Sequence, residues 1–147
     1  MKRIISFIII LLAVSGVSFA AERAVGEPNS SLENTRWTLI RVGDQKIAQA
    51  KDAKREAHIM LKPEGNRVAG SGGCNRIMGG YELKGKDISF TGMASTRMAC
   101  VGSLMETESA FLKALEATRG WKIVGEKLTL VDGGGKALAE FRAVDKK

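Results

Sequence analysis

Short stretches rich in aromatic and β-branched residues, separated by glycine, proline or aspartate turns, recur from Thr35 onward. They cover residues 37–42, 57–62, 67–70, 78–83, 88–90, 93–98, 121–124, 128–131 and 137–141. Residues of this kind favour β-strands, and turns this short join neighbouring strands in antiparallel order. The segment 47–55 is weakly patterned and predicts a loop with a short strand. The repeated short strands therefore predict an antiparallel sheet.

One helix is expected, which starts with a cap at residues 103–106 and continues over residues 107–118. Ser103 and Glu106 fit a capping box, in which the two residues cap each other's backbone N–H groups. Gly120 is placed where a left-handed residue would end the helix. The stripe that would face the sheet is apolar with one polar interruption. It consists of Leu104, Glu108, Phe111 and Leu115.

The order of strands, helix and strands predicts an α+β fold. We expect a curled antiparallel sheet, a partial barrel of about seven to nine short strands, with one α-helix covering an open face. The chain of 147 residues has room for one domain, placed at residues 35–143 and followed by a tail at 144–147.

Residues 1–20 have the pattern of an export signal. A basic start precedes an apolar run over residues 4–14, and Ser18 and Ala20 put small residues at positions −3 and −1 of a cleavage site. This layout predicts a secretory signal peptide that is cut after Ala20, and a periplasmic protein.

Two other interpretations concern the same end of the chain. Residues 4–19 approach the length of a membrane span, so an uncleaved anchor is the alternative to a signal peptide. A lipid anchor would need a cysteine directly after the apolar run, and neither Cys74 nor Cys100 lies there. Residues 21–34 are polar and predict a flexible leader. No later apolar run is long enough to span a bilayer, so we expect no transmembrane span after cleavage.

The net charge of +7 suggests an acidic partner at first. Residues 1–20 contain two basic residues and no acid, so 21 basic and 16 acidic residues remain after cleavage, a net charge of +5. This is ordinary for a soluble domain. We expect no nucleic-acid partner in the periplasm, and only a weak preference for anionic lipid headgroups. We also expect a monomer.

The two cysteines predict a disulfide between Cys74 and Cys100, because an isolated pair in an exported domain is usually oxidised. Two buried free thiols and a catalytic cysteine are the alternatives. A nucleophilic cysteine needs a base within reach, and His58 is the only histidine. We therefore predict no catalytic residues. One histidine and two cysteines are too few for a structural zinc site, and no metal or other cofactor is expected.

Two polar motifs remain as candidate binding sites. The glycine-rich stretch around Gly72 and Gly73 lacks the Gly-Lys-Ser/Thr and helix start of a phosphate loop, which favours a tight turn or bulge. Ser95, Thr96 and Arg97 combine hydroxyls with a guanidinium, which could bind a carboxylate or phosphate. The alternative is that these groups satisfy a strand end and a turn.

Taken together, these two motifs resemble those of the META domain family, which includes HslJ-like envelope proteins. The motifs are Gly72-Gly73-Cys74-Asn75-Arg76 and Ser95-Thr96-Arg97-Met98-Ala99-Cys100. The resemblance extends over about residues 32–143. It implies a small α+β domain with a curled antiparallel sheet, a role in stress or novobiocin-type drug tolerance at the envelope, and no known catalytic residue.

Three functions are consistent with these observations. The first is a non-enzymatic domain that binds a protein partner or another envelope component, such as a lipid. The second is a carrier or sensor of a small apolar ligand, held in the barrel interior by methionines. The methionines would be Met60, Met78, Met93, Met98 and Met105. The third is a cysteine-dependent enzyme.

Overall fold

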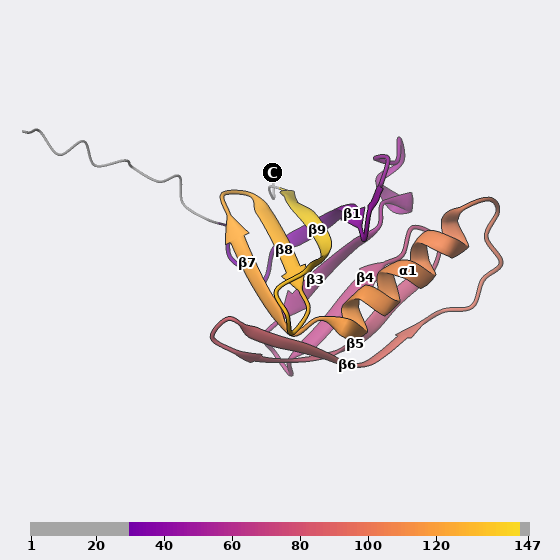
Figure 1. Cartoon of the computed structure of the whole chain (residues 1–147). Helices are drawn as coiled ribbons and strands as arrows, with labels where there is room; N and C mark the ends of the chain where they lie inside the picture. Colours follow the sequence, from indigo (N-terminus) through magenta and orange to yellow (C-terminus); the bar gives the residue numbers. More distant parts are fainter. Residues whose placement is uncertain (1–29, 145–147) are drawn as a thin grey trace, which may run out of the picture.

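Nine β-strands curl into a ring and one α-helix, α1 (Leu104–Ala117), lies against it in the computed structural model, which describes residues 30–144 (Figure 1). The strands are β1 (Arg36–Val42), β2 (Gln45–Lys46), β3 (His58–Lys62), β4 (Arg67–Ser71), β5 (Arg76–Lys84), β6 (Asp87–Ser95), β7 (Gly120–Val124), β8 (Lys127–Val131) and β9 (Ala137–Val144). A short 3₁₀ turn, η1, occupies Ala53–Arg55. The α+β fold predicted from the sequence is confirmed.

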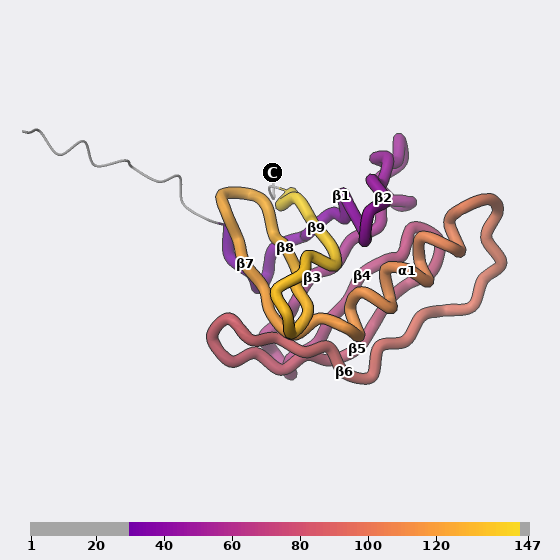
Figure 2. The backbone as a smooth tube through the Cα atoms, in the orientation of Figure 1, coloured from indigo at the N-terminus to yellow at the C-terminus, as the bar shows by residue number. Residues whose placement is uncertain are grey.

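All pairings between these strands are antiparallel, and β1 closes the ring because it pairs with both β3 and β9. The ring is uneven. Strands β6 and β7 are paired only at Asp87 and Gly120, so they diverge along most of their length. Helix α1 contacts β6, β9 and β1 and thus lies across this gap (Figure 2).

The interior of the ring is filled by one cluster of buried apolar side chains. Trp37, Phe111 and Phe141 are completely buried, and the rings of the two phenylalanines lie 5.7 Å apart. Every strand except β2 contributes buried or partly buried residues to this cluster, largely in the alternation that β-geometry requires. A filled interior counts against a carrier that would hold an apolar ligand inside the ring.

The methionines do not line the interior, contrary to expectation. Ile59 and Leu61 point inward from β3, so Met60 between them points outward. The same alternation turns Met78 outward from β5, where half of its surface is exposed. Met98 and Met105 are also about half exposed, and only Met93 is partly buried against the core.

Strand β6 is one continuous strand where the sequence predicted two. It begins one residue earlier and ends three residues earlier than those predictions. Residues 88–90 and 93–98 were expected to form two strands, but one strand passes through Gly92, whose φ is +57°. The pairing register with β5 shifts at this point: Met78 pairs with Ala94 and Gly80 with Thr91, so β6 carries one extra residue as a bulge. The strand ends at Ser95 because Thr96 turns away to meet another segment, described below.

The N-terminus of α1 differs from the prediction. The helix begins at Leu104, directly after Ser103 as predicted, but Ser103 makes no side-chain cap. Ser103 has φ −75° and ψ 1°, whereas a capping serine needs an extended backbone to reach the next N–H groups. The predicted capping box between Ser103 and Glu106 is therefore wrong.

The helix also ends differently, because Gly120 is the first residue of β7 and not a left-handed cap. Thr118 has an extended backbone and its hydroxyl donates to the Ala114 carbonyl at 2.7 Å. The Arg119 guanidinium donates to the Glu116 carbonyl at 2.9 Å. These side chains satisfy helix-end carbonyls that a glycine cap would otherwise serve.

The domain starts earlier than residue 35. Leu32 is buried and its carbonyl accepts from the Trp37 indole at 2.9 Å, and Asn34 N–H donates to the Leu61 carbonyl at 2.8 Å. Residues 30–34 thus belong to the fold, although the expected leader extended to residue 34. The predicted signal peptide at 1–20 and the leader up to residue 29 lie outside the described residues. Within residues 30–144, no helix is long and apolar enough to cross a membrane.

Candidate functional site

A disulfide joins Cys74 to Cys100, with 6.1 Å between their Cα atoms. Cys74 lies in the turn between β4 and β5, and Cys100 lies in the connection from β6 to α1. The predicted pairing is confirmed, and no free cysteine is present in the described residues. The bridge fastens the wide connecting loop of residues 96–103 to the sheet (Figure 2).

Asn75 is the centre of the two motifs and is 1% exposed. Its side-chain oxygen accepts from the Met98 N–H at 2.8 Å and from the Thr96 hydroxyl at 3.1 Å. Its amide nitrogen donates to Glu108 Oε1 at 2.9 Å and is 3.4 Å from the Met98 carbonyl. Asn75 therefore links the glycine-rich turn, the 96–100 segment and the helix.

Glu108 binds Asn75 at two points. While Oε1 accepts from the Asn75 side chain, Oε2 accepts from its backbone N–H at 3.0 Å. The glutamate is 5% exposed and lies on the face of α1 that also buries Phe111 and Leu115. The polar interruption of the predicted apolar stripe is thus the hydrogen-bond partner of the motif. Sequence reasoning assigned it no role.

The two glycines of the motif make room for this contact. A Cβ atom on Gly72 would lie 2.5 Å from Glu108 Cγ and Oε2, a distance that real side chains do not show. Gly73 has φ +103°, which L-residues rarely adopt, and its N–H donates to the Ser71 hydroxyl at 3.0 Å. The structure supports the tight-turn interpretation of the glycine-rich stretch.

The remaining motif residues divide between the cluster and the surface. The Thr96 hydroxyl accepts from the Arg76 N–H at 3.1 Å, so it serves the strand end. Ser95 is the last residue of β6 and pairs with Ile77. The side chains of Arg76 and Arg97 are exposed. The structure brings Asn75, Arg76 and Thr96 together but does not form an anion site from the Ser95–Arg97 hydroxyls and guanidinium.

His58 lies on the outer face of β3 in a small polar cluster. Arg36 Nη1 lies 3.1 Å from His58 Nε2, and His58 Nδ1 lies 2.8 Å from the Glu56 carbonyl. An arginine can only donate, so Nε2 accepts and the proton of the neutral ring is on Nδ1. Burial lowers the pKa of His58 below its ordinary value of 6.5; its bond to the Glu56 carbonyl opposes this shift, and the Arg36 charge adds to it.

This lowered pKa predicts a pH-dependent stability. The unfolded chain takes up a proton at His58 more readily than the folded one, so the contribution of His58 is complete above pH 6.5 and is lost as the pH falls through the folded pKa. Urea unfolding at pH 7.5, 6.5 and 5.5 should show a steeper loss for the wild type than for His58→Gln. Parallel losses in the two proteins would contradict the prediction.

A groove of about 710 Å³ opens on the outer face beside the motif. We call it the cationic groove. Its charged lining comes from four different elements or their flanks and its apolar lining includes two methionines. These residues are Arg36, Lys54, Lys62, Arg76, Met60 and Met98. No carboxylate is among its lining residues in the described chain, although Glu56 lies 3.5 Å from the Arg36 guanidinium.

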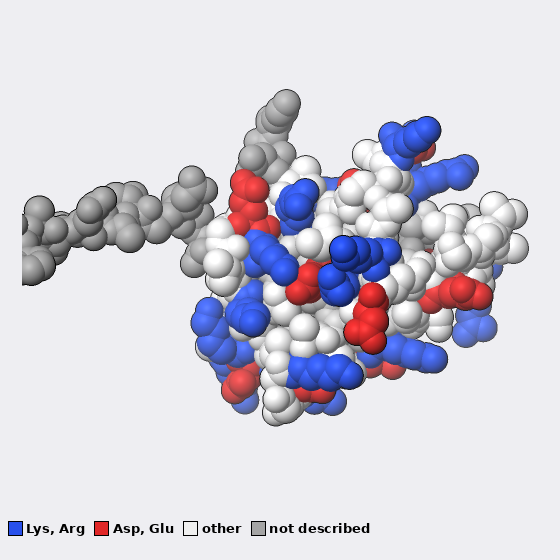
Figure 3. Space-filling model, turned by 45° about the horizontal axis from the view of Figure 1, so that its top comes forward, with Lys and Arg blue, Asp and Glu red and all other residues white. Residues whose placement is uncertain are grey.

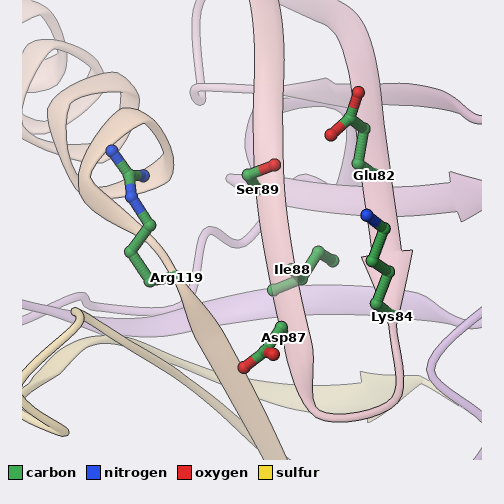
Figure 4. A pocket seen from close by; sticks show the side chains of 6 residues that line it. All are labelled: Glu82, Lys84, Asp87, Ile88, Ser89 and Arg119. Carbon is green, nitrogen blue, oxygen red and sulfur yellow. The ribbon is translucent and has the colours of Figure 1, made fainter.

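Other surfaces carry charges of both signs. On the face shown in Figure 3, lysine and arginine are interspersed with aspartate and glutamate. A cavity of about 310 Å³ between the β5–β6 hairpin and the end of α1 is lined by Glu82 and Asp87 as well as Lys84 and Arg119 (Figure 4). This cavity therefore has no predominant charge, and its Arg119 is already hydrogen-bonded to the end of α1.

Two further observations limit the chemistry of the site. Within residues 30–144, no group of three or more His, Cys, Asp or Glu residues is placed to hold a metal ion. The polar groups of Asn75, Thr96 and Glu108 bond to one another and to the backbone. The cluster therefore holds the fold together, and the cationic groove lies beside it.

A curled antiparallel ring, one covering helix and a disulfide beside a buried asparagine define a small α+β domain. The chain belongs to the META domain family, which matches residues 30–145. A comparison with curated proteins finds no match.

Solved structures of similar fold include two determined by NMR. One is 23% identical with a TM-score of 0.59, and the similarity covers 76% of this chain and 91% of the other. The second, from Burkholderia xenovorans, is 30% identical with a TM-score of 0.55 and covers 78% and 85%. A crystal structure of a DUF4847 family protein from Bacteroides vulgatus is 14% identical with a TM-score of 0.55, and covers 79% and 96%.

Proposed function

We propose that this META-domain protein is exported and acts as a non-enzymatic binding domain at the cell envelope. It binds a protein partner or another envelope component and so supports tolerance of heat or of novobiocin-type drugs. The observation that carries the proposal is the cationic groove, which lies directly beside the family motif and is bordered by Cys74 and Arg76.

The internal bonding of the motif supports binding over catalysis. Cys74 and Cys100 are bridged, so neither offers a thiolate for attack. Asn75 and Glu108 are buried and use their hydrogen bonds within the fold. Export is supported by the signal-like pattern of residues 1–20 and by the disulfide, which oxidising compartments favour.

Complementation of a deletion strain tests this function. Wild-type protein should restore growth under heat or novobiocin, whereas Lys62→Glu together with Arg76→Glu should not, because both cations line the groove. Lys122→Glu is the matched control, since Lys122 is also an exposed strand lysine but lies on β7. Cell fractionation should recover the protein from the periplasm. Mass spectrometry should give the mass of a chain that starts at Ala21.

The proposal would be overturned by either of two results. One is full complementation by the groove variant, at wild-type protein levels. The other is a protein that stays in the cytoplasm with residues 1–20 attached.

A further inference from the structure

We propose that the cationic groove docks the protein onto a membrane surface rich in anionic phospholipid. Lysine and arginine side chains would contact lipid phosphates, while neighbouring methionine and valine side chains enter the headgroup layer. This inference rests on the proposed function and names the chemistry of the envelope component.

Three of the four cationic side chains of the groove form no ion pair with a described residue. The ion pairs of the described residues involve Arg36, Arg41 and Lys127, and none includes a groove lysine or Arg76. Lys54, Lys62 and Arg76 are exposed. Three unneutralised cations around one groove create a local positive potential that a surface of phosphates would match.

Apolar side chains protrude at the same place. Cross-strand pairing sets Met60, Ala69 and Met78 in one row across β3, β4 and β5. One flanking row ends in Arg76, and the other contains Lys62. An apolar row between cationic rows is the arrangement by which amphipathic surfaces bind the membrane interface.

The exposed apolar residues concentrate near this face. Among the described residues, six large apolar side chains are exposed, and four belong to β5 or to the stretch from residue 98 to 105. Val101 is the most exposed of them, at 84%. Met98, which lines the groove, is 57% exposed. Val101 and Cys100 line a smaller cavity that shares Lys54 and Cys74 with the groove, so the two surfaces adjoin.

A lipid surface fits this face better than an acidic peptide does. Strands β3 and β4 are hydrogen-bonded on both sides, to β1 and β5 as well as to each other, so no free edge can accept a peptide strand. Met78, Met98 and Val101 are exposed by 50%, 57% and 84%, so these apolar side chains reach into solvent at or beside this face. Protruding side chains gain burial when they enter a lipid layer.

Vesicle co-sedimentation tests the docking surface with the exported, disulfide-bridged protein. The probes are vesicles of phosphatidylcholine alone and vesicles with about one third phosphatidylglycerol. The wild type should bind only the anionic vesicles, and less tightly as salt rises. Each of Lys62→Glu and Arg76→Glu should weaken binding roughly 20-fold, because a reversal removes one attractive charge and adds one repulsive charge.

Two controls are matched to the chain. Lys122→Glu should leave binding within about twofold, since it alters net charge equally but lies on β7. Val101→Ser should weaken binding with little change in its salt dependence, whereas Val124→Ser, exposed by 73% on β7, should not weaken it.

The outcomes separate this inference from the proposed function. Equal binding to both vesicle types, or equal effects of Lys62→Glu and Lys122→Glu, would overturn the lipid surface. So would binding to polyglutamate without binding to anionic vesicles, which would indicate an acidic peptide. If vesicles are not bound but the groove variant still fails to complement, the proposed function stands and only the lipid partner is wrong.

Discussion

Removing the disulfide should lower the stability of the domain by about 3–4 kcal/mol. The bridge closes a loop across 26 sequence positions, and the loss of chain entropy that it imposes on the unfolded state accounts for this magnitude. For a domain of this size, the melting temperature of Cys74→Ser should fall by about 10–15 °C under non-reducing conditions. Differential scanning calorimetry measures the change directly.

A reductant provides the control for this prediction. The wild type should melt near the variant when dithiothreitol is present, and the double variant Cys74→Ser/Cys100→Ser should melt at one temperature with or without it. The folded state should survive in all cases, because Asn75 still holds the 96–98 segment through Thr96 and Met98. Equal melting temperatures for oxidised wild type and variant would refute a stabilising bridge.

Alternation along a strand decides which side chains face inward, as in β3, where Ile59 and Leu61 are buried. The same rule placed Met60 outside, between two inward residues, but the sequence hypothesis treated methionines as lining by their chemistry. Parity was the stronger signal because it is set by backbone geometry. The local prediction of a cap at Ser103 failed because the backbone of that serine is not extended, so its hydroxyl makes no bond to the first turn of the helix.

Long-range features were out of reach for a single sequence. Ring closure depends on pairing between β1 and β9, which lie about a hundred residues apart, and no turn signal encodes it. The hydrogen bonds between Asn75 and Glu108 span 33 positions. The sequence did contain one indication of these hydrogen bonds. Glu108 interrupts an apolar helix stripe, and a glutamate in a buried stripe needs a polar partner.

Truncating that glutamate should be at least as costly as removing the disulfide. Glu108→Ala leaves the backbone N–H of Asn75 without its acceptor and removes the shorter hydrogen bond of its side-chain amide, at a residue that is 1% exposed. Two lost bonds to a carboxylate predict a destabilisation of about 3–5 kcal/mol. Urea denaturation should show a lower midpoint with little change in slope. Glu116→Ala, an exposed position on the same helix, should stay within about 0.5 kcal/mol of wild type.

Glu108→Gln separates the need for two acceptors from the need for a side chain of this size. Asn75 presents a donor to each carboxylate oxygen, so a glutamine can accept one bond but must point its NH₂ group at the other donor. We therefore expect a loss of about 2 kcal/mol in urea denaturation even though the shape is preserved. Asn75→Asp should be at least as damaging, since it sets an oxygen in place of the amide donor facing Oε1. A glutamine variant as stable as wild type would show that water or a shifted backbone can serve Asn75, and the carboxylate would then be dispensable for joining the helix to the motif.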